Sequence, residues 1–161
     1  MLELWAEART RFTTQLSSLT ATDLTKRLEP SHNSIGFLLR HIGDVELLFA
    51  KNVFGAQEIK VVAKTVIAQH DTGEWTDLEA LKTYVAHSYD TLKAIVAQQT
   101  DIDWETTVTT REFGTRTKAE AFGRIVSHTN HHAGQMVLIN KYGTSQSSDV
   151  PMAVAKDISI S

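Results

Sequence analysis

Hydrophobic residues recur at intervals of three or four along most of the chain, with polar residues between them, and this pattern is typical of amphipathic helices. Four stretches show it. Their in-register positions are Leu2, Trp5, Ala8, Phe12, Leu16 and Leu19; Ile35, Leu38, Ile42, Val45, Leu48, Phe49 and Val53; Leu78, Leu81, Val85, Tyr89, Leu92, Ile95 and Val96; and Ala121, Ile125, His128, His132, Met136 and Ile139. The pattern predicts four long helices, with Arg9 among the polar positions of the first.

Residues that favour helix ends flank these stretches. Ser34 is a suitable N-cap for the second helix, which we expect to end at Gly55. The segments Thr76–Glu79 and Thr117–Glu120 match the capping-box pattern and predict the starts of the third and fourth helices. Gly143 is the expected C′ residue of the last helix.

The connections are less regular. Residues 56–75 fit neither helical nor strand periodicity, so we predict a long loop that either covers a pocket or contains a further element. Residues 103–117 are rich in threonine and predict a small extended or hairpin segment. The sequence thus predicts an all-α protein, a four-helix bundle with long connections, forming a single domain over residues 1–143 with a C-terminal tail over residues 144–161.

Composition narrows the functional classes. The chain has 161 residues, 42% of them hydrophobic, and a formal net charge of -3, so it lacks the basic excess of a nucleic-acid-binding protein. It has no cysteine, which excludes disulfides and thiolate ligands and leaves only histidine and carboxylates to hold a metal. Gly-rich phosphate loops and the nucleophile elbow are absent. No basic leader or apolar stretch approaching about 18 residues is present, and we expect a cytoplasmic protein without a membrane partner.

Three histidines fall on helix faces that should point into the bundle. His41 lies in register between Leu38 and Val45, and His128 and His132 are one turn apart on the last helix. Sites in helix bundles are built from such core-facing side chains on different helices. Three imidazoles with one open position are the ligand set of a catalytic divalent site, and Zn²⁺, Ni²⁺ and Fe²⁺ all suit it. The alternative, three buried histidines without a metal, requires three separate sets of hydrogen-bond partners.

Four further polar residues lie near these positions. Asp44 follows His41 by three residues and is a candidate catalytic group, either accepting a hydrogen bond from a ligand histidine or transferring a proton. Gln135 is a second catalytic candidate that could contact a bound ligand. Arg124, which could attract an anionic substrate, and His131, at the border of the pocket, are candidates for cofactor binding. Ordinary exposed helix positions explain all four equally well.

Two segments resemble the DinB/YfiT-like superfamily: SIGFLLRHIGDVE at residues 34–46 and HTNHHAGQ at residues 128–135. The resemblance implies a four-helix bundle with three metal-binding histidines, which correspond to His41, His128 and His132. Ala133 stands where the family commonly has arginine. Characterised members of the family include transferases and isomerases that use low-molecular-weight thiols such as bacillithiol or mycothiol, and members often form homodimers.

We therefore hypothesise a metal-dependent enzyme that transfers a small-molecule thiol to a substrate. Since the chain has no cysteine, the thiol must be a cosubstrate. Two alternatives stay open at this point: a metal-dependent hydrolase that uses a metal-bound water, and a non-enzymatic metal-binding or stress-response bundle.

Overall fold

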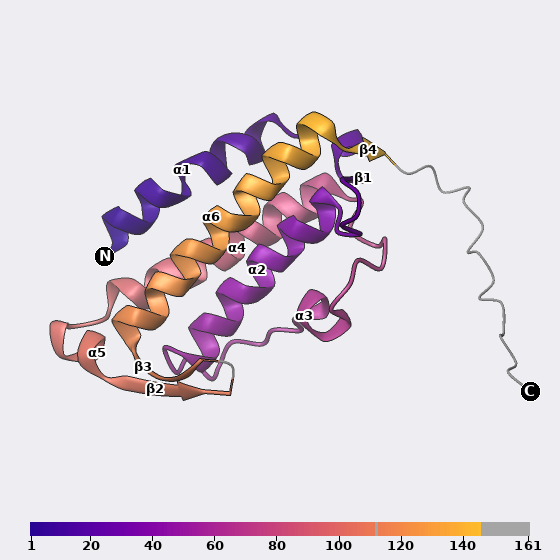
Figure 1. The fold of residues 1–161 in the computed structure, drawn as a ribbon. Helices are drawn as coiled ribbons and strands as arrows, with labels where there is room; N and C mark the ends of the chain where they lie inside the picture. The colour runs from indigo at the N-terminus through magenta and orange to yellow at the C-terminus, as the bar shows by residue number, and fades with distance from the viewer. Residues whose placement is uncertain (112, 146–161) are drawn as a thin grey trace, which may run out of the picture.

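Four long helices make up most of the structure, a computed structural model that describes residues 1–111 and 113–145 (Figure 1). The elements in chain order are α1 (Leu2–Ser18), a 3₁₀ helix η1 (Ala21–Asp23), β1 (Lys26–Arg27), α2 (Ile35–Asn52), α3 (Lys64–Ala68), α4 (Leu78–Ala97), α5 (Asp101–Glu105), β2 (Thr107–Thr110), β3 (Gly114–Thr117), α6 (Lys118–Tyr142) and β4 (Thr144–Ser145). Among these described residues, no helix has both the length and the apolar character needed to cross a bilayer.

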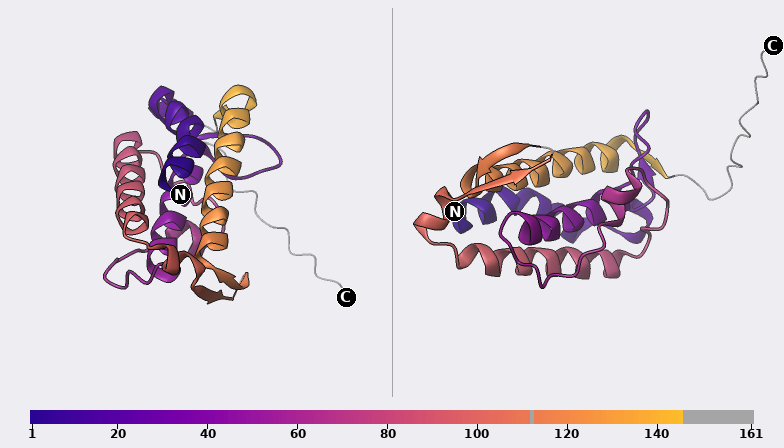
Figure 2. Two further views of the ribbon diagram at one scale, coloured as in Figure 1. Left: turned by 90° about the vertical axis from the view of Figure 1, so that its left-hand side faces the viewer. Right: turned by 90° about the horizontal axis from the view of Figure 1, so that it is seen from below.

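The long helices α1, α2, α4 and α6 pack side by side as a bundle, as the two further views in Figure 2 show. Helix α2 has its most extensive contacts with α4, and α6 packs against both α1 and α2. Two short antiparallel pairs complete the fold, the β2–β3 hairpin next to the start of α6 and the β1–β4 pair next to its end. The predicted all-α bundle, with a small extended segment before the last helix, is confirmed.

Side-chain caps fix where the helices begin. The hydroxyl of Ser34 accepts a hydrogen bond at the start of α2, and Thr117 opens α6 with a reciprocal capping box, both as predicted. The third predicted start is wrong by one residue. Helix α4 begins after Asp77 rather than Thr76, because the Asp77 carboxylate accepts the backbone N–H of Ala80.

Glycine at position 143 serves close packing rather than a left-handed turn. It has φ -77° and ψ 162°, an extended conformation, so the prediction that Gly143 is a C′ residue in the left-handed conformation was wrong. A Cβ at this position would lie 2.5 Å from the Ile139 carbonyl oxygen and 2.6 Å from that of Arg27, so only glycine fits. The chain then continues into Thr144–Ser145, which pair with β1, while residues 146–161 of the predicted tail lie outside the described residues.

The predicted loop at 56–75 contains a further element, the five-residue helix α3, which packs beside α2. Its short length and lack of clear periodicity explain why the sequence pattern did not reveal it. The segment returns to the bundle at Trp75, whose backbone carbonyl lies against Gly36 in the first turn of α2 so closely that no Cβ would fit there. The amide of Gly36 donates to the Leu24 carbonyl at 3.0 Å, which attaches the first turn of α2 to the segment after α1.

A buried ion pair joins three of the long helices. Arg9 on α1 pairs with Glu46 on α2, and Ser88 on α4 donates to the second carboxylate oxygen of Glu46 at 2.7 Å. The Arg9 guanidinium also lies 4.6 Å from the ring centre of Tyr89 and 4.8 Å from that of Phe12. The assignment of Arg9 to a polar face was therefore wrong, because the side chain is buried, its charge has a buried partner and its guanidinium lies among aromatic rings.

We expect Arg9→Met to destabilise the protein by about 3–5 kcal/mol at pH 8, because it leaves a buried carboxylate without its cation. Burial raises the pKa of Glu46, and Arg9 opposes that rise. A raised pKa in the folded state means that protonation favours folding and that stability is lost as pH rises through this pKa. Urea unfolding should therefore show a smaller loss for the variant at pH 5 than at pH 8.

The control is Arg9→Met combined with Glu46→Gln, which removes the titrating group while retaining a polar side chain. Relative to the wild type, this double variant should lose the same free energy of unfolding at pH 5 as at pH 8. An equal loss at pH 5 and pH 8 in the single variant would contradict a buried charge as the cause.

Candidate metal centre

Three imidazoles from two helices meet at one point inside the bundle. His41 comes from α2, and His128 and His132 lie one turn apart on α6. The Nε2 atom of His128 lies 3.1 Å from that of His41 and 3.1 Å from that of His132, and one ligand atom from each ring lies within 4.8 Å of the others. The structure brings together the three residues that the sequence selected, and they form a group that could hold a metal ion.

The outer nitrogens of two rings are hydrogen-bonded in a way that leaves Nε2 unprotonated. His41 Nδ1 lies 3.0 Å from the hydroxyl of Thr65, which itself donates to Asp44 at 2.8 Å, so Nδ1–H of His41 must be the donor. His132 Nδ1 lies 2.7 Å from Oε1 of Gln135, an oxygen that can only accept. Both rings therefore present an Nε2 lone pair to the centre.

His128 completes a set of donors that fits a cation. Its Nε2 can carry only one proton, so at most one of the two contacts is a hydrogen bond, and the other brings two nitrogens to 3.1 Å with no proton between them. Its Nδ1 is buried without a hydrogen-bond partner among the described residues. A divalent cation bound by the three Nε2 atoms would replace this repulsion by attraction, and imidazole suits zinc, nickel and iron.

Burial keeps these rings neutral. Loss of solvent, followed by the neighbouring imidazoles, lowers the pKa of His128 to about 3, and burial lowers that of His132 to about 4. Burial also lowers the pKa of His41, although the charge of Asp44 opposes the change. Neutral imidazole is the form that binds metal ions, so the folded protein offers three ligands at neutral pH without first losing protons.

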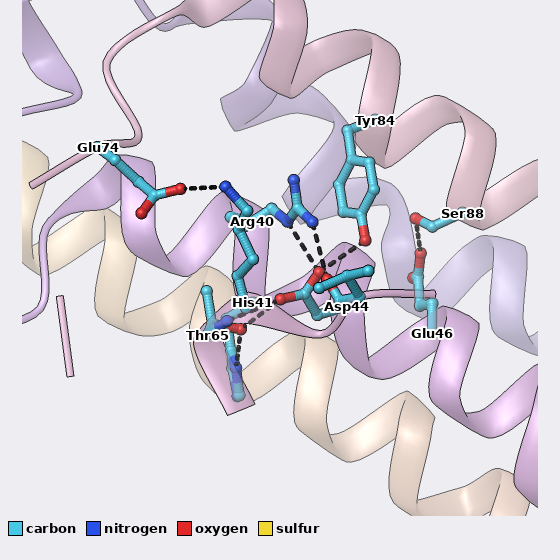
Figure 3. A network of polar contacts seen from close by, with 10 residues as sticks. Arg40, His41, Asp44, Glu46, Thr65, Glu74, Tyr84 and Ser88 are labelled. Atoms are coloured by element: carbon cyan, nitrogen blue, oxygen red, sulfur yellow. Dashed lines mark hydrogen bonds and ion pairs between the residues drawn. The ribbon is translucent and has the colours of Figure 1, made fainter. Parts of the chain in front are cut away.

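Asp44 lies behind His41 and connects it to the rest of the bundle (Figure 3). Its fully buried carboxylate accepts hydrogen bonds from Arg40 Nε at 2.8 Å, the Tyr84 hydroxyl at 2.6 Å, and both the amide and the hydroxyl of Thr65 at 2.9 and 2.8 Å. These bonds attach α3 and α4 to α2 at the level of the ligand. Phe37 stacks on the His41 imidazole. The two ring centres are 5.7 Å apart, and the ring planes are nearly parallel.

A cavity of about 1080 Å³ opens beside the histidines. Its walls come from α2, α3, α6 and the β2–β3 hairpin, and many of them are apolar, including Phe37, Val45, Phe49 and Phe113. All three candidate ligands line it. A molecule in this cavity can therefore reach the point where the Nε2 atoms converge.

The four secondary candidates occupy different places. Arg124 and His131 line the cavity, and the His131 ring lies 5.1 Å from that of His132. Asp44 and Gln135 are not among the lining residues and contact the rear of His41, through Thr65, and of His132. Their positions correspond to the carboxylate and amide groups that orient metal-binding imidazoles in proteins.

Sequence reasoning missed several residues of the site. Thr65, the direct partner of His41, lies in the segment predicted as a loop, where no periodicity marks it. Arg111 and Arg116 line the cavity from the hairpin, a segment whose position over the site depends on tertiary packing. Phe37 alone carried a signal, because it precedes His41 by four residues and so shares its face of α2.

Comparisons with known proteins show the family and the fold of the chain. A sequence model of the DinB superfamily matches residues 4–136. Two solved structures are similar in fold, the crystal structure of the mycothiol-dependent maleylpyruvate isomerase, with 18% identity and a TM-score of 0.65, and that of a histidine-to-alanine mutant of this isomerase, with 17% and 0.62. Each match covers 93% of this chain and 62% of the other, so the chain spans less than two thirds of these relatives. No curated protein matches the sequence.

We expect the purified protein to bind one divalent ion per chain and His132→Ala to lose it, because two imidazoles remain where three are needed. Elemental analysis by mass spectrometry after dialysis against Zn²⁺ measures the stoichiometry. The matched control is His87→Ala, which removes an exposed histidine from α4 and should retain the ion. Full metal content in His132→Ala would contradict the ligand assignment.

Thr65→Val should weaken zinc binding by about 10–100-fold, the usual effect of removing a group that orients a ligand. Valine keeps the shape of threonine but deprives His41 Nδ1–H of its acceptor and Asp44 of one donor. Competition with a chromophoric chelator measures the affinity, and circular dichroism confirms that the variant is folded. Unchanged affinity in a folded Thr65→Val protein would show that this hydroxyl does not orient the ligand.

Proposed function

Because this chain belongs to the DinB superfamily, we propose that it is a metal-dependent enzyme in which His41, His128 and His132 hold a divalent cation. The observation that carries the proposal is the convergence of their Nε2 atoms on the wall of a cavity large enough for small molecules. A divalent cation held there would lower the pKa of a thiol or water that binds beside it and make it nucleophilic near neutral pH.

The nucleophile in this proposal is the sulfur of a low-molecular-weight thiol. The chain has no cysteine, so a sulfur nucleophile must come from a cosubstrate. The similarity in fold to an isomerase described as mycothiol-dependent supports this choice. In the reaction, the thiol releases its proton to solvent, the sulfur forms a bond to an electrophilic carbon, and the leaving group departs with the electron pair of its own bond.

The protein's own residues then have distinct roles. Asp44, acting through Thr65, and Gln135 hold the His41 and His132 rings so that Nε2 faces the centre. His131, an exposed imidazole on the cavity wall, would contact the incoming thiol. The apolar walls around Phe37 and Phe49 limit water near the reacting atoms, which strengthens the electrostatic interactions there.

A thiol-consumption assay tests this function. Protein loaded with Zn²⁺, Ni²⁺ or Fe²⁺ is mixed with an electrophile such as 1-chloro-2,4-dinitrobenzene and with mycothiol, bacillithiol, glutathione or N-acetylcysteine in turn. We expect at least one thiol to be consumed in equal amount to the conjugate, with the rate falling to the uncatalysed level in His132→Ala and unchanged in His87→Ala.

Other outcomes would contradict the proposal in informative ways. Conversion of a substrate at the same rate when no thiol is added would favour a hydrolase, in which water is the nucleophile. Full metal loading with no turnover of any thiol and electrophile pair would favour a non-enzymatic metal-binding bundle.

A further inference from the structure

Three arginines line the cavity that contains the histidines. Arg111 and Arg116 come from the β2–β3 hairpin and Arg124 from the first half of α6. The described residues that line the cavity include no aspartate or glutamate, whereas three guanidinium groups line it. The described lining of the cavity therefore carries positive charge without a carboxylate of its own to balance it.

The alternation of the hairpin strands explains why Arg116 faces the cavity. Thr107, Thr109, Thr115 and Thr117 share one face, and the hydroxyls of Thr109 and Thr115 lie 2.8 Å apart. The opposite face carries Val108 directly across from Arg116, and both residues line the cavity. Because strand side chains alternate between faces, the threonine-rich pattern places this arginine on the cavity side.

Arg124 connects the hairpin to the histidines. It precedes His128 by four residues on α6, so their Cβ atoms are about 5–6 Å apart on one helix face. Its guanidinium lies 3.9 Å from the ring centre of Phe113, next to the hairpin turn. The aromatic ring holds the cation in place by a cation–π interaction without neutralising it.

The three cavity arginines differ from other arginines of the bundle in their ion pairing. Arg9, Arg27 and Arg40 each form an ion pair with a buried carboxylate. None of the three cavity arginines pairs with a carboxylate in the part of the chain that the structure describes. Arg116 Nη1 donates to the Thr115 backbone carbonyl at 2.7 Å, a neutral group that does not balance its charge, so the three guanidinium groups can still bind an anion that enters the cavity from solution.

We propose that Arg111, Arg116 and Arg124 form a carboxylate-binding subsite, so that the cavity takes a small molecule with a carboxylate at one end and an apolar body. The inference rests on the proposed function in one respect: the end of this molecule opposite the carboxylate would react at the histidine cluster. The spacing on α6 places the carboxylate about one helical turn from the reacting centre. The carboxylate belongs either to the electrophilic substrate or to the thiol.

Calorimetric titration of metal-free protein with 3-phenylpropanoate and with its neutral amide tests the subsite. Removal of the metal with a chelator prevents the carboxylate from binding to the ion and separates this test from that of the metal site. We expect the acid to bind at least about ten-fold more tightly than the amide, and this preference to decrease as NaCl is raised, because salt screens the charges.

Single Arg116→Gln and Arg124→Gln variants should each weaken binding of the acid by about five-fold or more and leave binding of the amide unchanged. Arg11→Gln, which removes an exposed arginine from α1, is the matched control and should bind both as the wild type does. Equal binding of acid and amide, or an Arg124→Gln variant that binds like Arg11→Gln, would overturn the proposal. Circular dichroism confirms that each variant is folded.

A second titration identifies the source of the carboxylate. Zinc-loaded protein is titrated with N-acetylcysteine and with N-acetylcysteine amide, which differ only in this charge. A preference for the acid that Arg124→Gln abolishes assigns the carboxylate to the thiol. No preference here, together with the expected result for 3-phenylpropanoate, assigns it to the electrophile. Absence of zinc binding would contradict the proposed function while leaving the metal-free test of the subsite intact.

Discussion

The site depends on the convergence of three imidazole Nε2 atoms on one point, with 3.1 Å between His128 and each of the other two. Such an arrangement is unfavourable for lone pairs alone, so the surrounding structure must hold the rings in place. Thr65 and Asp44 hold His41 from behind, and Gln135 holds His132. The bundle provides the rigid frame, because α2 packs directly against both α4 and α6. The close approach of the three rings thus lowers the stability of the fold locally, and the packing of the long helices offsets this loss.

Much of the fold and the centre of the site could be predicted from the sequence because both follow helical periodicity. The apolar stripes identified all four long helices, and the same stripes placed His41, His128 and His132 on inward faces. Caps located helix starts to within one residue, since they depend on local hydrogen bonds. The threonine-rich composition of residues 103–117 predicted an extended or hairpin segment, and the hairpin forms over residues 107–117, whereas residues 103–105 belong to the short helix α5.

The remaining parts depend on contacts between segments that are distant in sequence. Arg9 had the spacing of a surface residue, and only its pairing with Glu46, 37 positions away, explains its burial. Thr65 reaches His41 across 24 positions from a short helix without clear periodicity. The orientation of Arg116 toward the cavity requires knowing which hairpin face meets the bundle. Periodicity shows on which face of its own helix or strand a residue lies. It does not show which residue of another element that side chain contacts.

X-ray absorption spectroscopy of the zinc-loaded protein tests the central claim most directly. Three histidine ligands predict a first shell of nitrogen or oxygen atoms at about 2.0–2.1 Å, with multiple-scattering features that fit three imidazoles. In His41→Ala the fitted number of imidazoles should fall to two or the zinc should be lost. A first shell that fits one imidazole or none in the wild type, or a spectrum unchanged in His41→Ala, would contradict a metal centre built from these three residues.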